Sequence, residues 1–202
     1  MQAKIHWLGH SGFKIAGEKI IYFDPYQIAD TQKADIILIS HDHYDHLSLR
    51  DIGLIRSKET TIVVPEEINS TLLGDVRSLY PGDAIEISGV QIQAVPAYNI
   101  GKPFHPKSKY YLGYIVTMGG ESFYHSGDTD YIPEMKSVRA DVVMLPVSGT
   151  YTMTAEEAAR AVADIQPKIA IPMHWGSVAG SRADAERFKK LCQCEVWIPE
   201  KT

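Results

Sequence analysis

The feature that most constrains this chain is a run of metal-ligating side chains at residues 40–47, which reads SHDHYDHL. Within six positions it holds three histidines and two aspartates, directly after the apolar stretch 36–39. Imidazole nitrogens and carboxylate oxygens are the ligands that zinc and similar divalent cations prefer. A polar loop that is rich in histidine by chance is the alternative, but the whole chain of 202 residues has only 8 histidines. The density of the run therefore indicates a metal site at the end of a strand.

The spacing inside this run separates its ligands. Side chains alternate in an extended backbone, so His41, His43 and Asp45 would point the same way. His46 is offset from that row and would reach a second metal ion beside the first. The run by itself thus accommodates two neighbouring ions.

The composition is that of an ordinary globular protein, with 45% hydrophobic and 22% charged residues. A length of 202 residues fits one domain with a substantial core. The formal net charge of -5 disfavours a broad nucleic-acid-binding face, which needs clustered Lys and Arg. It does not exclude a small phosphorylated substrate, which one basic side chain could hold.

Several features bear on where the protein works. The first residues carry no basic stretch followed by an apolar segment, so we expect no signal peptide. No apolar run approaches the ~20 residues of a membrane-spanning helix. Cys192 and Cys194 are too close in sequence for a good disulfide, so we expect two buried thiols in a reducing compartment. These features predict a cytoplasmic protein, and a homo-oligomer is compatible with them.

Hydrophobic periodicity predicts early strands in hairpins and later strands that alternate with helices. That order fits a single αββα domain over residues 1–202, with two mixed sheets packed face to face and helices outside. The nearly pure apolar stretches 35–39 and 141–145 indicate strands buried on both faces. The expected strands are 3–8, 12–16, 19–23, 35–39, 60–64, 84–87, 90–95, 111–117, 121–125, 141–145, 168–172 and 195–198, and the expected helices are 47–58, 66–73, 154–165 and 182–191.

Five polar loops each follow an apolar strand, and they carry His10, Asp24, residues 41–46, Asp128 and His174. If these strands run in one direction, the loops meet at one edge of the sheets, where a site is expected. Residues 96–109 show neither the hydrophobic period of a helix nor that of a strand. Long irregular loops of this kind in compact domains are often functional.

The motif set resembles the metallo-β-lactamase fold of hydrolases over essentially the whole chain. The resemblance rests on the HxHxDH pattern of residues 41–46, the Gly127-Asp128 pair and the late His174. Residues 9–13 (GHSGF), Asp24-Pro25 and residues 125–129 (HSGDT) are similar to the group close to ascorbate-6-phosphate lactonase. The HxHYDHL run also resembles the N-acyl-phosphatidylethanolamine phospholipase D branch.

The resemblance implies two divalent metal ions, zinc or manganese, with iron or nickel as alternatives. It assigns the first ion to His41 and His43, the second to Asp45, His46 and His174, and makes Asp128 the bridge between them. A hydroxide between the ions would be the nucleophile, because bound cations lower the pKa of water and stabilise the developing oxyanion. Asp45 and Asp128 are therefore the catalytic candidates, with Asp45 orienting the water or accepting its proton.

One departure from the family pattern concerns the first ion. The family supplies a further histidine from a loop after a mid-chain strand, where this chain reads Pro96-Ala97-Tyr98-Asn99. Three outcomes are open: His105 in the same loop replaces that ligand, Asn99 or a water completes a weaker site, or one metal site alone is strongly occupied.

Four further side chains could support the ligands or face the substrate. Asp24 closes a strand before a proline, so it is a turn residue or an acceptor that fixes a ligating histidine. His10 is a structural histidine or a substrate-facing one, and Tyr98 and Asn99 belong to the irregular loop.

We expect a hydrolase that opens an ester, lactone or phosphoester of a small metabolite, lactonase-like in its group. The alternatives are a phosphodiesterase on a phospholipid-like or nucleotide substrate, and a non-catalytic metal-binding protein on the same fold. The absence of histidine from residues 97–99 is what favours the last alternative.

Overall fold

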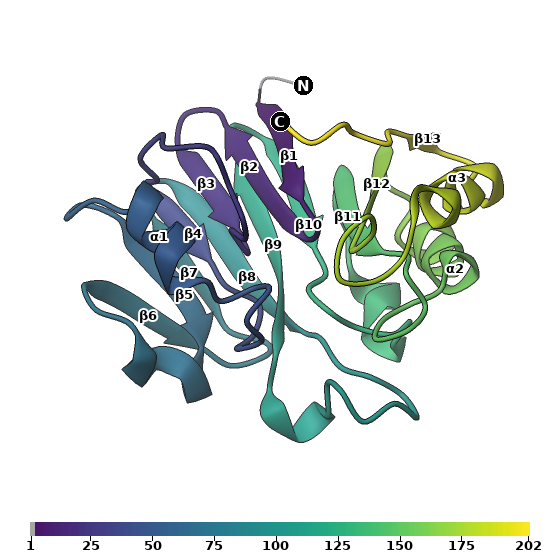
Figure 1. Cartoon of the computed structure of the whole chain (residues 1–202), viewed down its shortest axis with the longest axis horizontal. Helices are drawn as coiled ribbons and strands as arrows, with labels where there is room; N and C mark the ends of the chain where they lie inside the picture. Colours follow the sequence, from purple (N-terminus) through teal and green to yellow (C-terminus); the bar gives the residue numbers. More distant parts are fainter. Residues whose placement is uncertain (1–2) are drawn as a thin grey trace.

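The computed structural model describes residues 3–202, without the side chains of residues 69–71. Met1 and Gln2, on which part of the signal-peptide expectation rests, lie outside the described residues. Two β-sheets face each other, with helices against their outer faces (Figure 1). The predicted αββα sandwich is therefore confirmed.

The first sheet has the strand order β1-β2-β3-β4-β5-β6. Its first three strands are antiparallel, and β3 to β6 are parallel. The strand β6 was not expected, because its alternating exposed charges have the character of an edge strand rather than of a buried one. The bounds are β1 Lys4–Gly9, β2 Gly12–Ala16, β3 Ile20–Phe23, β4 Ile36–Leu38, β5 Thr61–Pro65 and β6 Asp75–Leu79.

The second sheet has the order β13-β12-β11-β10-β9-β8-β7. Here β7 to β10 are antiparallel and β10 to β13 are parallel, so both halves of the chain begin with hairpins and end with parallel strands. The bounds are β7 Ala84–Ile87, β8 Val90–Pro96, β9 Leu112–Met118, β10 Glu121–His125, β11 Val142–Pro146, β12 Ile169–Met173 and β13 Glu195–Val196.

The apolar run of β4 is explained by two separate cores. Ile36 and Leu38 belong to the core between the two sheets. Ile37 and Ile39 belong to a second core on the outer face, together with Ile52 of the first helix. Alternate side chains of one strand thus enter different cores, and neither face of β4 meets solvent.

The helices begin and end at recognisable signals. The helix α1 (Leu49–Ile55) is shorter than predicted, because the chain turns before Ser48 and becomes extended at Arg56. In α2 (Ala155–Ile165) the predicted capping box of Thr154 and Glu157 is present. The remaining segments are α3 Arg182–Leu191 and the 3-10 turns η1 Glu66–Thr71, η2 Lys107–Lys109 and η3 Pro133–Ser137.

The strand directions bring the polar loops together. The strands β1, β3 and β4 end at one edge of the first sheet, and β10 and β12 end at one edge of the second. Elsewhere, Cys192 and Cys194 are free and half-buried, and burial raises the pKa of Cys192 to about 12. No helix between residues 3 and 202 has the length and hydropathy that crossing a bilayer requires.

Candidate metal centre

The histidine loop, residues 41–46, follows β4 and contains a tight backbone turn. This turn distributes its ligands between two groups. The backbone N–H groups of His46 and Leu47 both donate to the carbonyl oxygen of His43, at 3.0 and 2.8 Å. Because of this turn, Asp45 does not share a direction with His41 and His43, as an extended backbone would require. That expectation was wrong, and Asp45 instead lies beside His46.

The first group consists of His41, His43 and His105. His43 Nδ1 lies 3.1 Å from His41 Nε2 and 3.2 Å from His105 Nε2. His41 and His105 are 1% exposed, whereas His43 is half-buried at the mouth of a cavity. Three imidazole nitrogens that converge in this way form the donor set of a zinc-type site.

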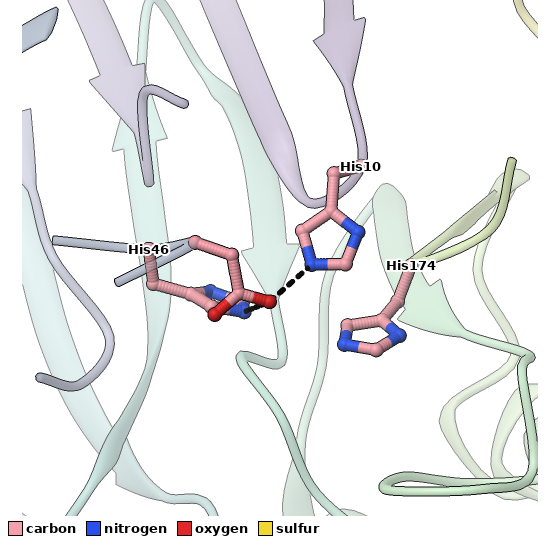
Figure 2. A group of neighbouring side chains, drawn as sticks. His10, His46 and His174 are labelled. Atoms are coloured by element: carbon pink, nitrogen blue, oxygen red, sulfur yellow. Dashed lines mark hydrogen bonds and ion pairs between the residues drawn. The ribbon is translucent and has the colours of Figure 1, made fainter. Parts of the chain in front are cut away.

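The second group consists of Asp45, His46 and His174, with His10 beside them (Figure 2). Asp45 Oδ2 lies 3.9 Å from His46 Nε2 and 3.0 Å from His10 Nε2. The His10 ring also packs on His174, with 4.2 Å between the ring centroids. A mixed set of carboxylate and imidazole ligands therefore assembles from loops after β1, β4 and β12.

Asp128 lies between the two groups. Its Oδ2 atom is 3.0 Å from His174 Nε2, 3.5 Å from His46 Nε2 and 3.5 Å from His105 Nε2. Burial opposes its charge, but the imidazoles of His174 and His46 hold the pKa of the Asp128 carboxyl well below its usual range. The carboxylate is thus ionised and within reach of both donor groups.

The second ring nitrogen of four histidines has a hydrogen-bond partner, and for His41, His46 and His105 that partner accepts, which fixes the tautomer. His46 Nδ1 donates to Asp24 Oδ2 at 2.7 Å, and His41 Nδ1 donates to Ser40 Oγ at 2.8 Å. In each case Nδ1 carries the donated proton, so Nε2 is the ring nitrogen that faces inward. The corresponding pairs for the other two are His105 Nδ1 with Asn99 Oδ1 at 3.1 Å and His174 Nδ1 with Ser148 Oγ at 3.0 Å.

Three buried side-chain atoms of the site have no hydrogen-bond partner among the described residues, namely His10 Nδ1, His46 Nε2 and Asp128 Oδ1. Leaving such atoms unsatisfied costs ~1–3 kcal/mol each, so a partner is expected for them. Burial disfavours a charge on His46, yet Asp128 and Asp24 together raise its pKa well above the usual range. Inward-facing Nε2 atoms, buried polar atoms without partners and a preference for positive charge all fit divalent cations.

Asp24 connects the two groups through hydrogen bonds to Ser40 and His46. Its Oδ1 accepts from the Ser40 N–H at 2.7 Å, and its Oδ2 accepts from Ser40 Oγ at 2.6 Å as well as from His46. Ser40 Oγ in turn accepts from His41. One buried carboxylate therefore orients a histidine of each group. Ser40 was not singled out from the sequence, although its place directly before the ligand run was a usable signal.

The irregular loop 96–109 is pinned by contacts with the second half of the chain. Asn99 Nδ2 donates to Asp130 Oδ1 at 3.1 Å and to the Tyr151 carbonyl at 2.9 Å. Lys102 Nζ donates to Asp130 Oδ1 at 2.5 Å. These contacts bring His105 to the place beside His43. Tyr98 is oriented differently: its hydroxyl donates to Glu134 Oε2 at 2.8 Å, and it lines a separate cavity.

Two further features hold the loop that carries Asp128. His125 Nε2 donates to the Ser11 carbonyl, and its Nδ1 accepts from the Gly127 N–H. Gly127 has φ +61°, and a Cβ there would lie 2.6 Å from the Leu112 carbonyl oxygen. Only glycine permits this approach without strain, and it places the residue before Asp128 against the backbone of Leu112, the first residue of β9.

A cavity of about 430 Å³ opens in front of both groups. His43, Asp45, His105, Asp128 and His174 all contribute to its wall. The donor groups are therefore accessible to a small molecule rather than sealed in the core.

Comparisons with known proteins identify the family of this chain. Residues 4–174 match the family model described as the beta-lactamase superfamily domain. The UPF0173 metal-dependent hydrolase Ta0764 of Thermoplasma acidophilum is 34% identical over 93% of this chain and 90% of its own length. A crystal structure named for a metal-dependent hydrolase of Parabacteroides distasonis has a TM-score of 0.89 and 34% identity, covering 99% of this chain and 94% of that one.

A more distant structure supports the fold alone. Igni18, a metallo hydrolase from Ignicoccus hospitalis, has a TM-score of 0.83 at 24% identity, over 98% of this chain and 95% of its own. The extent of the family match and the identity to its relatives together show that this chain belongs to the UPF0173 metal-dependent hydrolases of the metallo-β-lactamase superfamily.

Proposed function

We propose that this hydrolase opens an ester or lactone bond of a small metabolite with the help of two divalent ions. The observation that carries the proposal is the reach of Asp128 Oδ2 to histidines of both donor groups. His41, His43 and His105 would hold the first ion, Asp45, His46 and His174 the second, and Asp128 both. Zinc or manganese suits these donors best, with iron or nickel as alternatives.

Two ions held in these groups would supply a water of lowered pKa and a polarised scissile bond. The chain's own residues would arrange the rest. Asp45 lies on the cavity wall, and a hydrogen bond from His10 helps to hold its pKa below the usual range, against the opposing effect of burial. It is therefore ionised at neutral pH and suited to orient the attacking water or to accept its proton. Asp128 would keep the two ions in register.

The position of His105 favours a catalytic protein over a non-catalytic one. That alternative rested on the missing histidine at residues 97–99, and the Nε2 atom of His105 lies 3.2 Å from His43 Nδ1. A phosphodiesterase would use the same ligands, so a substrate panel is needed to distinguish it from a lactonase.

Metal analysis and an activity panel test the proposal together. Protein purified and loaded with zinc or manganese should contain two ions per chain and hydrolyse lactones or esters in preference to phosphodiesters. His43→Ala should lose one ion and the activity. His6→Ala is the matched control, because His6 is a half-buried residue of β1 outside both donor groups. Turnover of phosphodiesters alone would make a phosphodiesterase the better assignment than a lactonase. No turnover of any substrate would overturn the proposal.

We also propose that residues 1–202 act as one domain, since the main core takes side chains from both sheets. The two free thiols support a reducing, cytoplasmic location.

A further inference from the structure

We propose that the substrate carries an uncharged aromatic or aliphatic group beside the bond that is cleaved, rather than a phosphate or carboxylate. This inference rests on the proposed function, because it concerns the mouth of the same cavity. It is carried by the apolar side chains at that mouth and by the absence of lysine and arginine from the described residues that line the cavity.

The mouth of the cavity has an unusual share of exposed apolar side chains. Tyr44 is 67% exposed, Val178 47% and Phe104 41%, and all three line the cavity. Single exposed apolar residues are normal on a protein surface, but a group around a cavity marks a binding site. We call Tyr44, Phe104, Tyr151 and Val178 the apolar rim.

Aromatic pairs give this rim a defined shape. Phe104 and Tyr151 meet edge to face, with ring centroids 4.7 Å apart. Tyr44 meets Tyr26 in the same way at 5.9 Å. The first pair joins the irregular loop to the loop after β11, and the second joins the histidine loop to the loop after β3. Each pair thus holds an apolar surface in place before any ligand arrives.

Val178 adds a sign of strain at the rim. Its φ is +59°, which is a rare conformation for a β-branched residue. The Ala179 N–H donates to the Ser177 carbonyl at 2.5 Å, so the chain makes a tight three-residue turn with Val178 at its tip. Strained backbone of this kind concentrates at ligand-binding segments. The turn presents an isopropyl group to the cavity a few residues after His174.

No lysine or arginine occurs among the described residues that line the cavity. The basic side chains of the irregular loop already have carboxylate partners. Lys102 forms an ion pair with Asp130 and Lys107 with Glu134. Lys109 Nζ lies 3.8 Å from Glu67 Oε2. Asp42 also lines the cavity, and it is the one lining carboxylate outside the proposed metal ligands. An anionic group remote from the metals would therefore lose hydration without gaining a partner.

A matched pair of lactones tests the inference with the metal-loaded protein. We would compare γ-butyrolactones that carry a benzyl or a phosphomethyl group at the same ring carbon. The benzyl lactone should have the higher kcat/KM by about tenfold or more, the size of effect that one apolar contact supplies. An equal or higher kcat/KM for the phosphorylated lactone would overturn the inference.

Two rim variants make the comparison specific. Phe104→Ala should lower kcat/KM for the benzyl lactone by about tenfold. The ratio of kcat/KM between the benzyl and the phosphorylated lactone should fall with it. Phe104→Lys should shift the preference toward the phosphorylated lactone. Phe104 is exposed, so neither change disturbs the core. Tyr80→Ala is the control, because Tyr80 is similarly exposed but lines a different cavity. Equal effects of Phe104→Ala and Tyr80→Ala would contradict a role for the rim.

A binding measurement separates this inference from the proposed reaction. 4-Methylbenzohydroxamate and 4-carboxybenzohydroxamate share a metal-chelating head and differ in charge at the far end. Calorimetry on the zinc-loaded protein should give the methyl compound a Kd about tenfold lower. Equal binding, or tighter binding of the carboxylate, would refute the inference. If no substrate is turned over, the proposed reaction fails, and this comparison still decides the chemistry of the rim.

Discussion

Asn99 Oδ1 accepts two hydrogen bonds from His105, one from its backbone N–H at 2.9 Å and one from its ring Nδ1 at 3.1 Å. One amide oxygen thus fixes both the backbone and the ring of this histidine. Burial lowers the pKa of His105 to about 4, so the ring is neutral at pH 7 and its Nε2 lone pair is free. Asn99 thus accepts from the His105 ring as Asp24 accepts from the His46 ring.

Substitution of either Asn99 or His105 should weaken the binding of the first ion only. We expect His105→Ala to lower the bound metal from two ions to one, and Asn99→Ala to weaken that ion by about 10- to 100-fold, the usual effect of losing a partner of a ligating histidine. Zinc titration followed by elemental analysis checks both. Tyr98→Phe is the control, because the Tyr98 hydroxyl contacts Glu134 instead. A His105→Ala protein with two tightly held ions would exclude His105 as a ligand.

Substitution of His10 should act through Asp45. The His10 backbone has φ +52°, which asparagine tolerates, so His10→Asn removes the bond to Asp45 Oδ2 while the turn stays intact. We expect the ion at Asp45 to bind about tenfold more weakly, and the ion at His41 to be unaffected. Calorimetric titration resolves the two steps. Unchanged affinity at both sites would mean that His10 only packs against His174.

The Asp24 network offers a pair of variants with different expected patterns. Asp24→Asn keeps the shape and the backbone conformation but loses the charge that faces Ser40 and His46. It should weaken both ions, by about 10- to 100-fold in total. Ser40→Ala removes the contact to His41 and should weaken mainly the first ion. Two-step zinc titrations distinguish these outcomes, and a Ser40→Ala protein that loses the second ion alone would contradict the assignment.

Asp141 should control part of the acid stability. Hydrogen bonds from Lys168 and then from Ser122 lower its pKa to about 2 from 3.8. A carboxyl whose pKa is lower in the folded state stabilises the fold fully above pH 3.8, and this contribution is lost as the pH falls through about 2. Asp141→Asn should therefore lower the free energy of unfolding at pH 7 by about 1 kcal/mol.

Urea denaturation of Asp141→Asn and of the parent protein between pH 7 and pH 2 measures this effect. The difference between the two proteins should shrink toward pH 2, because Asp141 takes up its proton in the folded parent protein as the pH approaches its pKa of about 2. A difference that is constant with pH would show that the side chain acts by packing rather than by its charge. Glu59→Gln is the control, since Glu59 is an exposed side chain outside the strands.

Much of the fold followed from local patterns. The apolar run 36–39 predicts a strand buried on both faces, and Thr154 with Glu157 predicts the start of α2, because these signals act over a few residues. The edge strand β6 escaped prediction because its exposed charges do not mark it as a core strand. The clustering of polar loops could also be anticipated, since it needs only the direction of the strands.

The ligand set is a different matter, since its final arrangement depends on contacts between distant segments. The sequence by itself determined the sandwich and a metal-binding run at residues 41–46. Tertiary structure alone decided that His105 lies beside His43. Loop 96–109 has no hydrophobic periodicity, and hydrogen bonds to Asp130 hold it in place. Tertiary structure likewise turned Asp45 toward His46, since a backbone turn overrides the alternation of an extended strand. Hydrogen bonds formed across ~30 residues or more leave no trace in local sequence patterns, and they determine which side chains face the cavity.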